Sequence, residues 1–91
     1  MTQAEIRDKV WAYIVENFLY MRPNLKVDPD DSLLRKGVFD SLGVMEVIGF
    51  IEETFGIAVE QEEITEANLG TLNSITAYVA TKLDGAKPAA G

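Results

Sequence analysis

Residues 37–55 read GVFDSLGVMEVIGFIEETF, and this stretch decides the fold. Its apolar side chains recur every three or four residues, which is the spacing of one face of an α-helix. They are Val44, Val47, Ile48, Ile51 and Phe55. Gly56 follows directly, and glycine readily takes the left-handed conformation in which many helices end. The pattern predicts an amphipathic helix over residues 41–55 that buries one face in a core.

Two segments on either side of this stretch show the same helical spacing. Thr2 and Glu5 fit a capping box at the start of a helix over 3–21, which Pro23 prevents from continuing. Thr71 caps a final helix. The apolar stripe of the first helix is Ile6, Val10, Tyr13, Ile14 and Phe18, and that of the last is Leu72, Ile75, Val79 and Leu83. Both helices therefore have a face to bury against the helix over 41–55.

The remaining segments are interpreted from their turn residues. Pro29, Gly37 and the run DPDDS at 28–32 make 23–39 an irregular connection, with one short turn at 32–35. Its apolar side chains are expected to pin it to the core, and they are Leu25, Val27, Leu33, Leu34, Val38 and Phe39. The acidic segment 60–65 is expected to form a short helix anchored by Ile64. The predicted fold class is therefore all-α, a four-helix bundle of three longer helices and one short helix.

The length of the chain limits its organisation. A protein of 91 residues has room for one domain with a limited core, so a large substrate cavity is not expected. We expect the domain to span 1–83 and a tail at 84–91, rich in Ala, Gly and Pro, to be disordered. No apolar run approaches the roughly 20 residues that cross a bilayer, and the first residues do not match a secretory signal. These features predict a free-standing, soluble monomer in the cytoplasm.

The chain contains no cysteine and no histidine. This composition excludes disulfides, thiolate metal sites, cysteine nucleophiles and the usual base that activates a serine. We therefore expect neither catalytic activity nor a resident metal. A net charge of −7 repels phosphate backbones, so nucleic acid is a poor partner.

The negative charge is concentrated in one part of the chain. Residues 1–36 carry six acids and six bases, whereas 37–81 carry eight acids and no lysine or arginine. The eight are Asp40, Glu46, Glu52, Glu53, Glu60, Glu62, Glu63 and Glu66. A field of one sign steers basic protein surfaces toward it. A solvated acidic face that serves only solubility is the alternative explanation.

The tripeptide Asp40-Ser41-Leu42 stands where the irregular connection becomes the long helix. A helix start offers unpaired backbone N–H groups and the positive end of the helix dipole, and both suit a phosphodiester on the Ser41 hydroxyl. Asp40 is placed to help hold a divalent ion or to orient the substrate of a modifying enzyme. The alternative is that Asp-Ser is an ordinary helix cap.

A second Asp-Ser-Leu occurs at 31–33 and allows a comparison within the chain. It is followed by LRKG at 34–37, which stops too soon for a long helix and adds basic charge. The serine of that copy, Ser32, is therefore the weaker candidate, and Ser41 is preferred.

Over nearly its full length the sequence resembles the acyl carrier protein and peptidyl carrier family. The matching stretches are DSLL at 31–34, GVFDSL at 37–42, EVI at 46–48 and EETFGI at 52–57, and residues 72–79 are similar to the last helix of the family. The resemblance implies that Ser41 receives covalent 4′-phosphopantetheine from coenzyme A through a phosphopantetheinyl transferase that needs magnesium. The thiol of this arm would hold an acyl or aminoacyl group as a thioester. The protein would then be a non-catalytic shuttle between loading ligases and acyl-transfer enzymes.

The resemblance also makes the helix over 41–55 the element that partners recognise. Five of its positions lie on a face other than the core stripe, namely Leu42, Met45, Glu46, Gly49 and Glu53. Two apolar residues flanked by acids suit a transient contact, and the alternative is that Leu42 and Met45 complete the core. The acids Glu60, Glu62 and Glu63 either extend this surface or only solvate it.

Two features differ from carriers of fatty acid biosynthesis. Gly43 stands where many of them have an acid directly after Asp-Ser-Leu, which removes one charge from the expected enzyme-binding surface. ITEANL at 64–69 is more similar to carriers of amino-acid loading and specialised pathways, D-alanyl carriers included. The cargo therefore stays open between fatty acyl, polyketide, aminoacyl and other groups. Large core side chains are expected to leave little room for a long acyl chain, and they are Trp11, Phe18, Phe39, Phe50 and Phe55.

Two other classes of protein fit parts of the pattern. An acidic helical interaction module that is never modified would explain the charge and the helices, but not the similarity of 37–42 to the carrier motif. Asp28, Asp30 and Ser32 imitate the opening of a calcium-binding EF-hand loop. That loop needs a glycine where Leu33 stands and a glutamate where Phe39 stands, so calcium binding is the weaker alternative.

Overall fold

Helix α2 (Ser41–Phe55) begins and ends where the sequence predicts, because local residues set both of its ends. The carboxylate of Asp40 caps the first turn, and Gly56 ends the helix in the left-handed region with a φ of 67°. The predicted stripe is buried at Val47, Ile48, Ile51 and Phe55, and half-buried at Val44. The helix therefore buries the expected face in the core.

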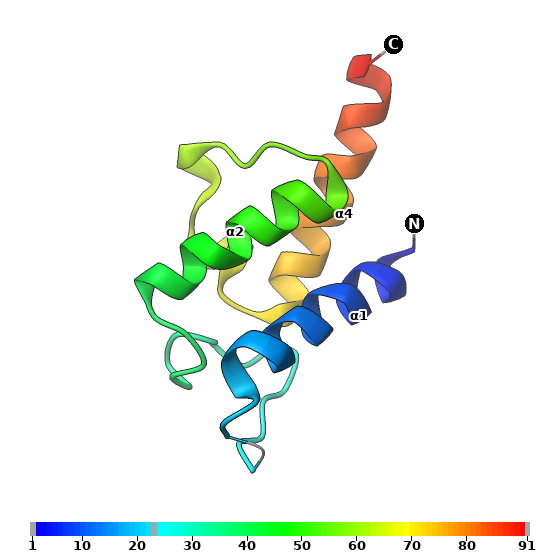
Figure 1. The fold of residues 1–91 in the computed structure, drawn as a ribbon. Helices are drawn as coiled ribbons and strands as arrows, with labels where there is room; N and C mark the ends of the chain where they lie inside the picture. Colours follow the sequence, from blue (N-terminus) through cyan, green and yellow to red (C-terminus); the bar gives the residue numbers. More distant parts are fainter. Residues whose placement is uncertain (1, 23, 91) are drawn as a thin grey trace.

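The computed structural model describes residues 2–22 and 24–90, with side chains up to residue 84. Helices α1 (Gln3–Ile14), α3 (Glu66–Leu69) and α4 (Leu72–Ala90) accompany α2, together with a π-helical turn η1 (Val15–Leu19) and a 3-10 turn η2 (Gln61–Glu63). No strand occurs in the described part of the chain. Figure 1 shows α1 and α2 packed over the first half of α4. The predicted all-α, four-helix fold is confirmed.

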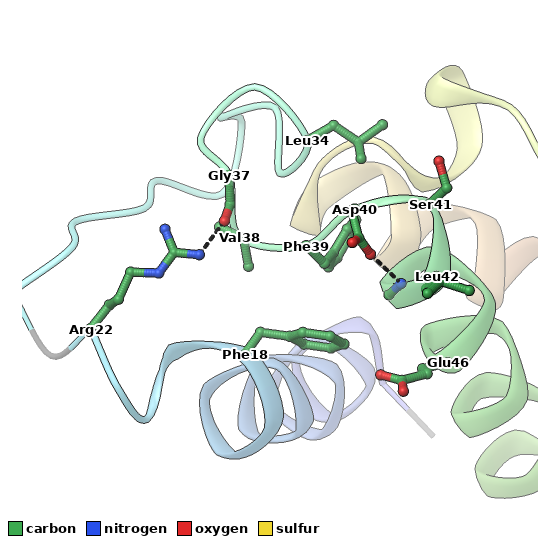
Figure 2. A pocket seen from close by; sticks show the side chains of 11 residues that line it. Phe18, Arg22, Leu34, Gly37, Val38, Phe39, Asp40, Ser41, Leu42 and Glu46 are labelled. Atoms are coloured by element: carbon green, nitrogen blue, oxygen red, sulfur yellow. Dashed lines mark hydrogen bonds between the residues drawn. The ribbon is translucent and has the colours of Figure 1, made fainter.

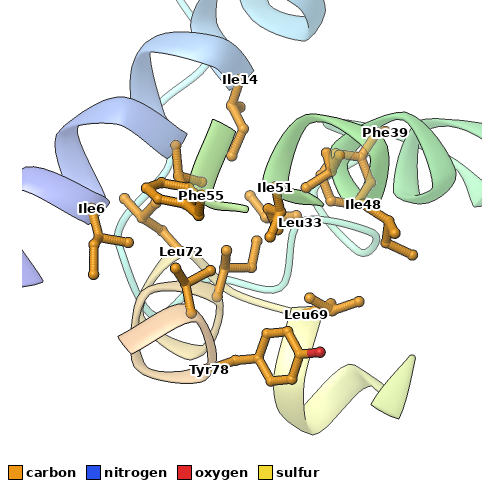
Figure 3. Close-up of a cluster of buried hydrophobic side chains, with 14 of the residues drawn as sticks. Ile6, Ile14, Leu33, Phe39, Ile48, Ile51, Phe55, Leu69, Leu72 and Tyr78 are labelled. Atoms are coloured by element: carbon orange, nitrogen blue, oxygen red, sulfur yellow. The ribbon is translucent and has the colours of Figure 1, made fainter. Parts of the chain in front are cut away.

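The core lies between α1, α2 and α4 and takes side chains from each of them. α1 packs against α4, and α2 and α3 contact α4 as well. Ile6 and Ile14 of α1, Ile51 of α2 and Leu72 of α4 converge in one cluster (Figure 3). Full burial of such an aliphatic side chain contributes about 1.5–3 kcal/mol relative to exposure. This shared cluster holds α2, and with it the serine at its start, in a fixed place.

The connection 24–40 is held to the core by buried side chains and a backbone hydrogen bond. Leu33 is fully buried, and its N–H donates to the carbonyl oxygen of Gly70 at 2.9 Å. Val38 and Phe39 are buried, as predicted. Leu34 is 44% exposed, because the turn over 33–37 places Leu33 inward and leaves its neighbour outside. The prediction that Leu34 pins the connection is therefore wrong.

The first helix differs from the predicted one in its last turns. Regular α-helix ends at Ile14, and the chain continues as η1 to Leu19, whereas the sequence predicts one α-helix over 3–21. A π turn accommodates an extra residue, and Phe18 of this turn meets the ring of Phe39 with centroids 5.4 Å apart. The side-chain amide of Asn17 donates to the carbonyl oxygen of Tyr13 at 2.9 Å. The widened turn thus serves a contact with the connection before α2, which helical spacing does not reveal.

The segment after α2 also differs from prediction. The sequence predicts one short helix over 60–65, but the chain forms η2 and then the separate helix α3. The Thr65 hydroxyl accepts a hydrogen bond from the N–H of Asn68 at 3.2 Å, so this threonine begins a helix rather than ending one. Helix α4 continues to Ala90. The domain limit at residue 83 and a disordered tail over 84–91 stay predictions.

Candidate functional site

The start of α2 presents Ser41 as the first helical residue, with Asp40 as its cap. Oδ1 of Asp40 accepts a hydrogen bond from the N–H of Gly43 at 3.0 Å (Figure 2). Because Asp40 provides the cap, the Ser41 hydroxyl is not needed for that purpose. Ser41 is exposed, its side chain points away from Phe18, and none of the hydrogen bonds among the described side chains involves its Oγ. Its hydroxyl is therefore accessible to a modifying enzyme.

The chain before Ser41 is anchored on the side of α1. Gly37 lies in the left-handed region with a φ of 71°, a conformation that favours glycine. Its carbonyl oxygen accepts a hydrogen bond from the Arg22 guanidinium (Figure 2). Val38 and Phe39, which follow, are both buried. The segment that precedes Ser41 is thus held in place by these contacts.

Gly43 is buried in the first turn of α2. A Cβ atom at this position would lie 2.4 Å from Cβ of Phe39 and 3.1 Å from Cε1 of Phe18. An acidic side chain, as expected here in a fatty-acid carrier, has no room without a shift of the backbone. The packing of Phe39 under the helix is therefore compatible with glycine at this position and not with an acidic residue.

The second Asp-Ser-Leu places its serine in a different environment. Ser32 is half-buried, and its Oγ donates to Oε1 of Glu66 at 3.1 Å and accepts from the N–H of Arg35 at 3.3 Å. The bond to Glu66 joins the connection to α3. The hydroxyl of Ser32 thus has structural partners, whereas that of Ser41 is left exposed.

The five positions expected to meet partners are all exposed, and they share one helix. They are Leu42, Met45, Glu46, Gly49 and Glu53. Leu42 is 76% exposed and Met45 57% exposed, so the interpretation that these two complete the core is wrong. Leu34 adds a third exposed apolar side chain beside Ser41. The start of α2 therefore carries an exposed apolar surface with acids further along the helix.

Two recesses flank the start of α2. A hollow of about 640 Å³ lies between η1 and the segment around Ser41, with Phe18, Arg22 and Leu42 among its walls (Figure 2). A smaller recess of about 150 Å³ lies between Leu34, Val44 and the segment 64–70. The first is wide and open to solvent, whereas the second is small and largely apolar. Sequence analysis did not predict either one, because both depend on contacts between distant segments.

Glu63, one of the acids near α3, accepts hydrogen bonds from three other residues of the protein. Oε1 of Glu63 accepts hydrogen bonds from the N–H of Glu60 at 3.0 Å, the Tyr78 hydroxyl at 3.1 Å and the Lys82 ammonium at 3.0 Å. The bond from Glu60 and the Lys82 contact lower the pKa of Glu63. Burial and the bond to Glu63 raise the pKa of Tyr78 to about 12. Glu63 therefore fastens η2 to α4, while Glu60 and Glu62 remain exposed.

The acids of the described chain are dispersed rather than clustered. No group of three or more acidic side chains in 2–22 and 24–84 is arranged to hold a metal ion. Asp40 contributes a single carboxylate at the serine, and one of its oxygens is used in the helix cap. Among the described helices, none has the length and apolar character needed to span a membrane.

Sequence reasoning missed three residues around the serine. Arg22 stands between a methionine and a proline, where nothing in the sequence connects it to Gly37. Phe18 packs against the core, as predicted, but it also lines the hollow beside Ser41, which its helical spacing does not indicate. Leu34 is predicted to pack on the core and is exposed. The positions of all three residues depend on contacts between segments that lie far apart in the chain.

Two comparisons with known proteins bear on this site. Residues 14–79 match the family described as "Phosphopantetheine attachment site". The D-alanyl carrier protein of Abiotrophia defectiva is 36% identical over 55 residues, which cover 60% of this chain and 70% of that protein. The matched family region contains both serines of the repeated tripeptide, the whole of α2 and the exposed face around Ser41.

Proposed function

Because the chain belongs to the phosphopantetheine attachment family, we propose that Ser41 is its attachment residue and that the protein carries an acyl or aminoacyl group between partner enzymes. The cofactor of this family is covalent 4′-phosphopantetheine. When attached, it supplies a terminal thiol that holds the cargo as a thioester. The observation that best supports the choice of residue is the exposed Ser41 hydroxyl at the first position of α2.

The residues at this position suit a phosphodiester. Ser41 lies at the end of the helix where backbone N–H groups are unpaired and the dipole is positive, so a phosphate on its oxygen is favoured. Arg22 lines the adjacent hollow and is the one base among the residues around it. Asp40 holds the first turn through Gly43 and keeps Ser41 in place. We assign Asp40 a positioning role, with its second carboxylate oxygen available to a magnesium ion during modification.

We propose that all acyl chemistry is performed by partners. Carrier proteins of this family work with transferases and ligases. The chain has no histidine or cysteine, so the residues around Ser41 include no evident base or second nucleophile. The exposed Leu42 and Met45, with Glu46, Gly49 and Glu53, form the proposed partner surface. Cytoplasmic location and a monomeric state stay predictions.

For the cargo we propose a small aminoacyl group such as D-alanyl. The relative from Abiotrophia defectiva is named a D-alanyl carrier protein. The apolar recess between α2 and α3 measures about 150 Å³, about the volume of a cavity that holds one benzene molecule. Phe39 and Phe55 are buried and occupy space in the core. A long acyl chain would have to displace such side chains to enter.

The test of the attachment residue is a mass measurement. The purified protein is incubated with coenzyme A, magnesium and a broad-specificity phosphopantetheinyl transferase, and its intact mass is recorded beside S41A and S32A. We expect the mass of one phosphopantetheinyl group to be added to the wild type and to S32A, and no addition to S41A.

S32A is a matched control, because it removes the serine of the other Asp-Ser-Leu and leaves α2 unchanged. Circular dichroism of each variant verifies that it is folded. If the folded wild type gains no mass with more than one transferase, the protein is instead an unmodified interaction module. Addition to S41A but not to S32A would move the site to Ser32.

A further inference from the structure

The chain just before Ser41 forms one wall of the adjacent hollow and has unpaired backbone groups. The hollow has a volume of about 640 Å³, and residues 37–43 all line it. Among the described residues, no hydrogen bond involves the N–H of Phe39 or Asp40, or the carbonyl oxygen of Val38 or Phe39. The backbone of Asp40 is extended, with a φ of −107° and a ψ of −165°. This wall therefore offers free donors and acceptors to a molecule in the hollow.

Arg22 stands at the end of this wall that is remote from Ser41. Its Nη2 donates to the carbonyl oxygen of Gly37 (Figure 2), and none of the carboxylates among the described side chains pairs with it. Gly37 lies four residues before Ser41, so the two are at most about 14 Å apart. The guanidinium has further N–H groups beyond the one that Gly37 accepts. Arg22 is therefore able to donate to an acceptor that lies in the hollow.

Apolar side chains form other parts of the wall. Leu42 and Leu34 are exposed and line the hollow. The half-buried ring of Phe18 also lines it, and it packs edge-on against Phe39. The hollow thus combines apolar contact, free backbone groups and one cation.

We propose that the pantetheine arm, once attached to Ser41, lies in this hollow along residues 37–40, with Arg22 near its thiol end. The inference rests on the proposed attachment of the arm to Ser41. The arm contains two amides, each with one donor and one acceptor. These amides can pair with the free backbone groups of 38–40 in the way that an added strand pairs with the edge of a sheet. Arg22 is placed to donate to the amide carbonyl nearest the thiol.

The length of the arm suits this course. From phosphorus to sulfur its chain has about thirteen bonds, as many as just over four residues of backbone, which reach about 15 Å when extended. The side chain of Ser41 points away from Phe18 (Figure 2), so the phosphate stays in solvent at the start of α2 and the arm turns back along the wall. The branched, apolar carbon that follows the phosphate then comes close to Leu42.

The apolar recess between α2 and α3 is the other hollow beside the start of α2. It measures about 150 Å³, the volume of a cavity that holds one benzene molecule, whereas the pantetheine part of the arm has about eighteen non-hydrogen atoms, about three times as many as benzene. The hollow on the side of η1 is more than four times as large, at about 640 Å³. Size and free backbone groups therefore both favour the hollow.

The first test locates the thiol end of the attached arm. Coenzyme A is labelled on its thiol with a maleimide nitroxide, and the labelled arm is transferred to the ¹⁵N-labelled protein by a phosphopantetheinyl transferase with magnesium. The nitroxide broadens the signals of nearby amides, and the same sample reduced with ascorbate is the reference. We expect loss of the amide signals of 18–22 and 37–38, while those of 64–70 keep most of their intensity.

Hydrogen exchange tests the backbone contacts with an unlabelled arm. The amides of Phe39 and Asp40 should exchange at least about threefold more slowly in the modified protein than in the unmodified one, the effect of one ordinary hydrogen bond. The amide of Val38 is the internal control, because its N–H already donates to the carbonyl oxygen of Leu33 at 2.9 Å. Its exchange should not change.

A variant with a matched control tests Arg22. R22Q keeps a side-chain donor but removes the positive charge and the other N–H groups. Broadening at 18–22 should fall in R22Q and should be unchanged in R35Q, which removes another exposed arginine of the same connection that does not line the hollow. Intact mass verifies that both variants carry the arm, and thermal denaturation verifies that both fold.

Three results would overturn the proposal: loss of signals at 64–70 in place of 18–22 and 37–38, no localised broadening, or unchanged exchange of the Phe39 and Asp40 amides. Equal broadening in R22Q and the wild type would overturn the assignment of Arg22. If no transferase modifies Ser41, the inference fails together with the proposed function. An arm that is attached but lies elsewhere contradicts the inference alone and leaves the carrier function standing.

Discussion

Gly43 and Gly49 lie six residues apart in α2 and have opposite surroundings. A Cβ at Gly43 would meet Phe39 at 2.4 Å, and one at Gly49 would meet nothing within 4 Å. Glycine is disfavoured in a helix by up to about 1 kcal/mol relative to alanine, so α2 tolerates a cost at both positions. At Gly43 the cost is offset by the close packing of Phe39. At Gly49 no packing contact offsets it, because the surface around this glycine is open.

The same substitution at these two glycines should therefore have opposite effects. G49A should raise the free energy of unfolding by up to about 1 kcal/mol. G43A should lower it by about 1–3 kcal/mol, because the added methyl overlaps Phe39 and forces it to move. Urea denaturation of the two variants beside the wild type measures both values. Equal stabilisation by the two substitutions would show that Phe39 moves aside at no cost.

Between helices, the attachment of η2 to α4 depends on a single carboxylate oxygen. Glu63 accepts hydrogen bonds from Glu60, Tyr78 and Lys82, which lower its pKa below the ordinary value of 4.5. A carboxyl group with a lower pKa in the folded state stabilises the fold above its ordinary pKa and loses that contribution as the pH falls through the folded value. The attachment is therefore present at neutral pH and weakens in acid.

E63Q is expected to be less stable than the wild type at pH 7, and the difference should shrink as the pH is lowered below about 4.5. Urea denaturation at pH values from 7 to 3 measures the difference. E62Q is the control, since the neighbouring Glu62 is exposed. A constant difference between E63Q and the wild type over this range would show that ionisation of Glu63 does not stabilise the fold.

Sequence patterns predicted those elements whose limits are set locally. The start of α1 follows from the capping box of Thr2 and Glu5, and the limits of α2 follow from Asp40 and Gly56. The π turn at 15–19 was not predicted, because its residue Phe18 contacts Phe39, which belongs to a distant segment of the chain. The split between η2 and α3 had a local signal in Thr65, which was interpreted as the end of a helix.

The candidate site, too, could be predicted from the sequence only in part. The preference for Ser41 over Ser32 follows from what comes after each serine in the sequence, and the structure gives the two hydroxyls different surroundings. The hollow beside Ser41 could not be predicted from the sequence, since Phe18, which lines it, comes from the distant turn η1. Residue periodicity assigns a side chain to a face, but it does not say which other segment that face will meet.

At the scale of the whole molecule, the amount of free space in the bundle limits the cargo. The apolar recess beside α2 holds about 150 Å³, the volume of a cavity that binds benzene, so an acyl chain beyond about six carbons would extend outside it. Each buried methylene group contributes about 0.8 kcal/mol. A bundle that enclosed a long chain would therefore become markedly more stable as the chain grew.

We expect the stability of the acylated protein to stop rising at short chain lengths. Acetyl, butanoyl, octanoyl and dodecanoyl forms are prepared from the matching acyl-coenzyme A with a transferase, and their melting temperatures are compared. The dodecanoyl form should melt within experimental error of the octanoyl form. A steady increase up to twelve carbons would contradict a small aminoacyl cargo, because it would show that the bundle opens to enclose the chain.

The start of α1 and the middle of α4 lie together at the far end of α2. Ile6 and Leu83 border one recess with Phe55, the last residue of that helix, whereas Ser41 stands at its first residue, about 21 Å away along the axis. Figure 1 shows the first turn of α1 and the last turns of α4 on the side opposite the start of α2. A tag at either end would therefore immobilise the protein on a bead or sensor surface with its serine directed into solution, where loading and unloading can be followed on the solid support.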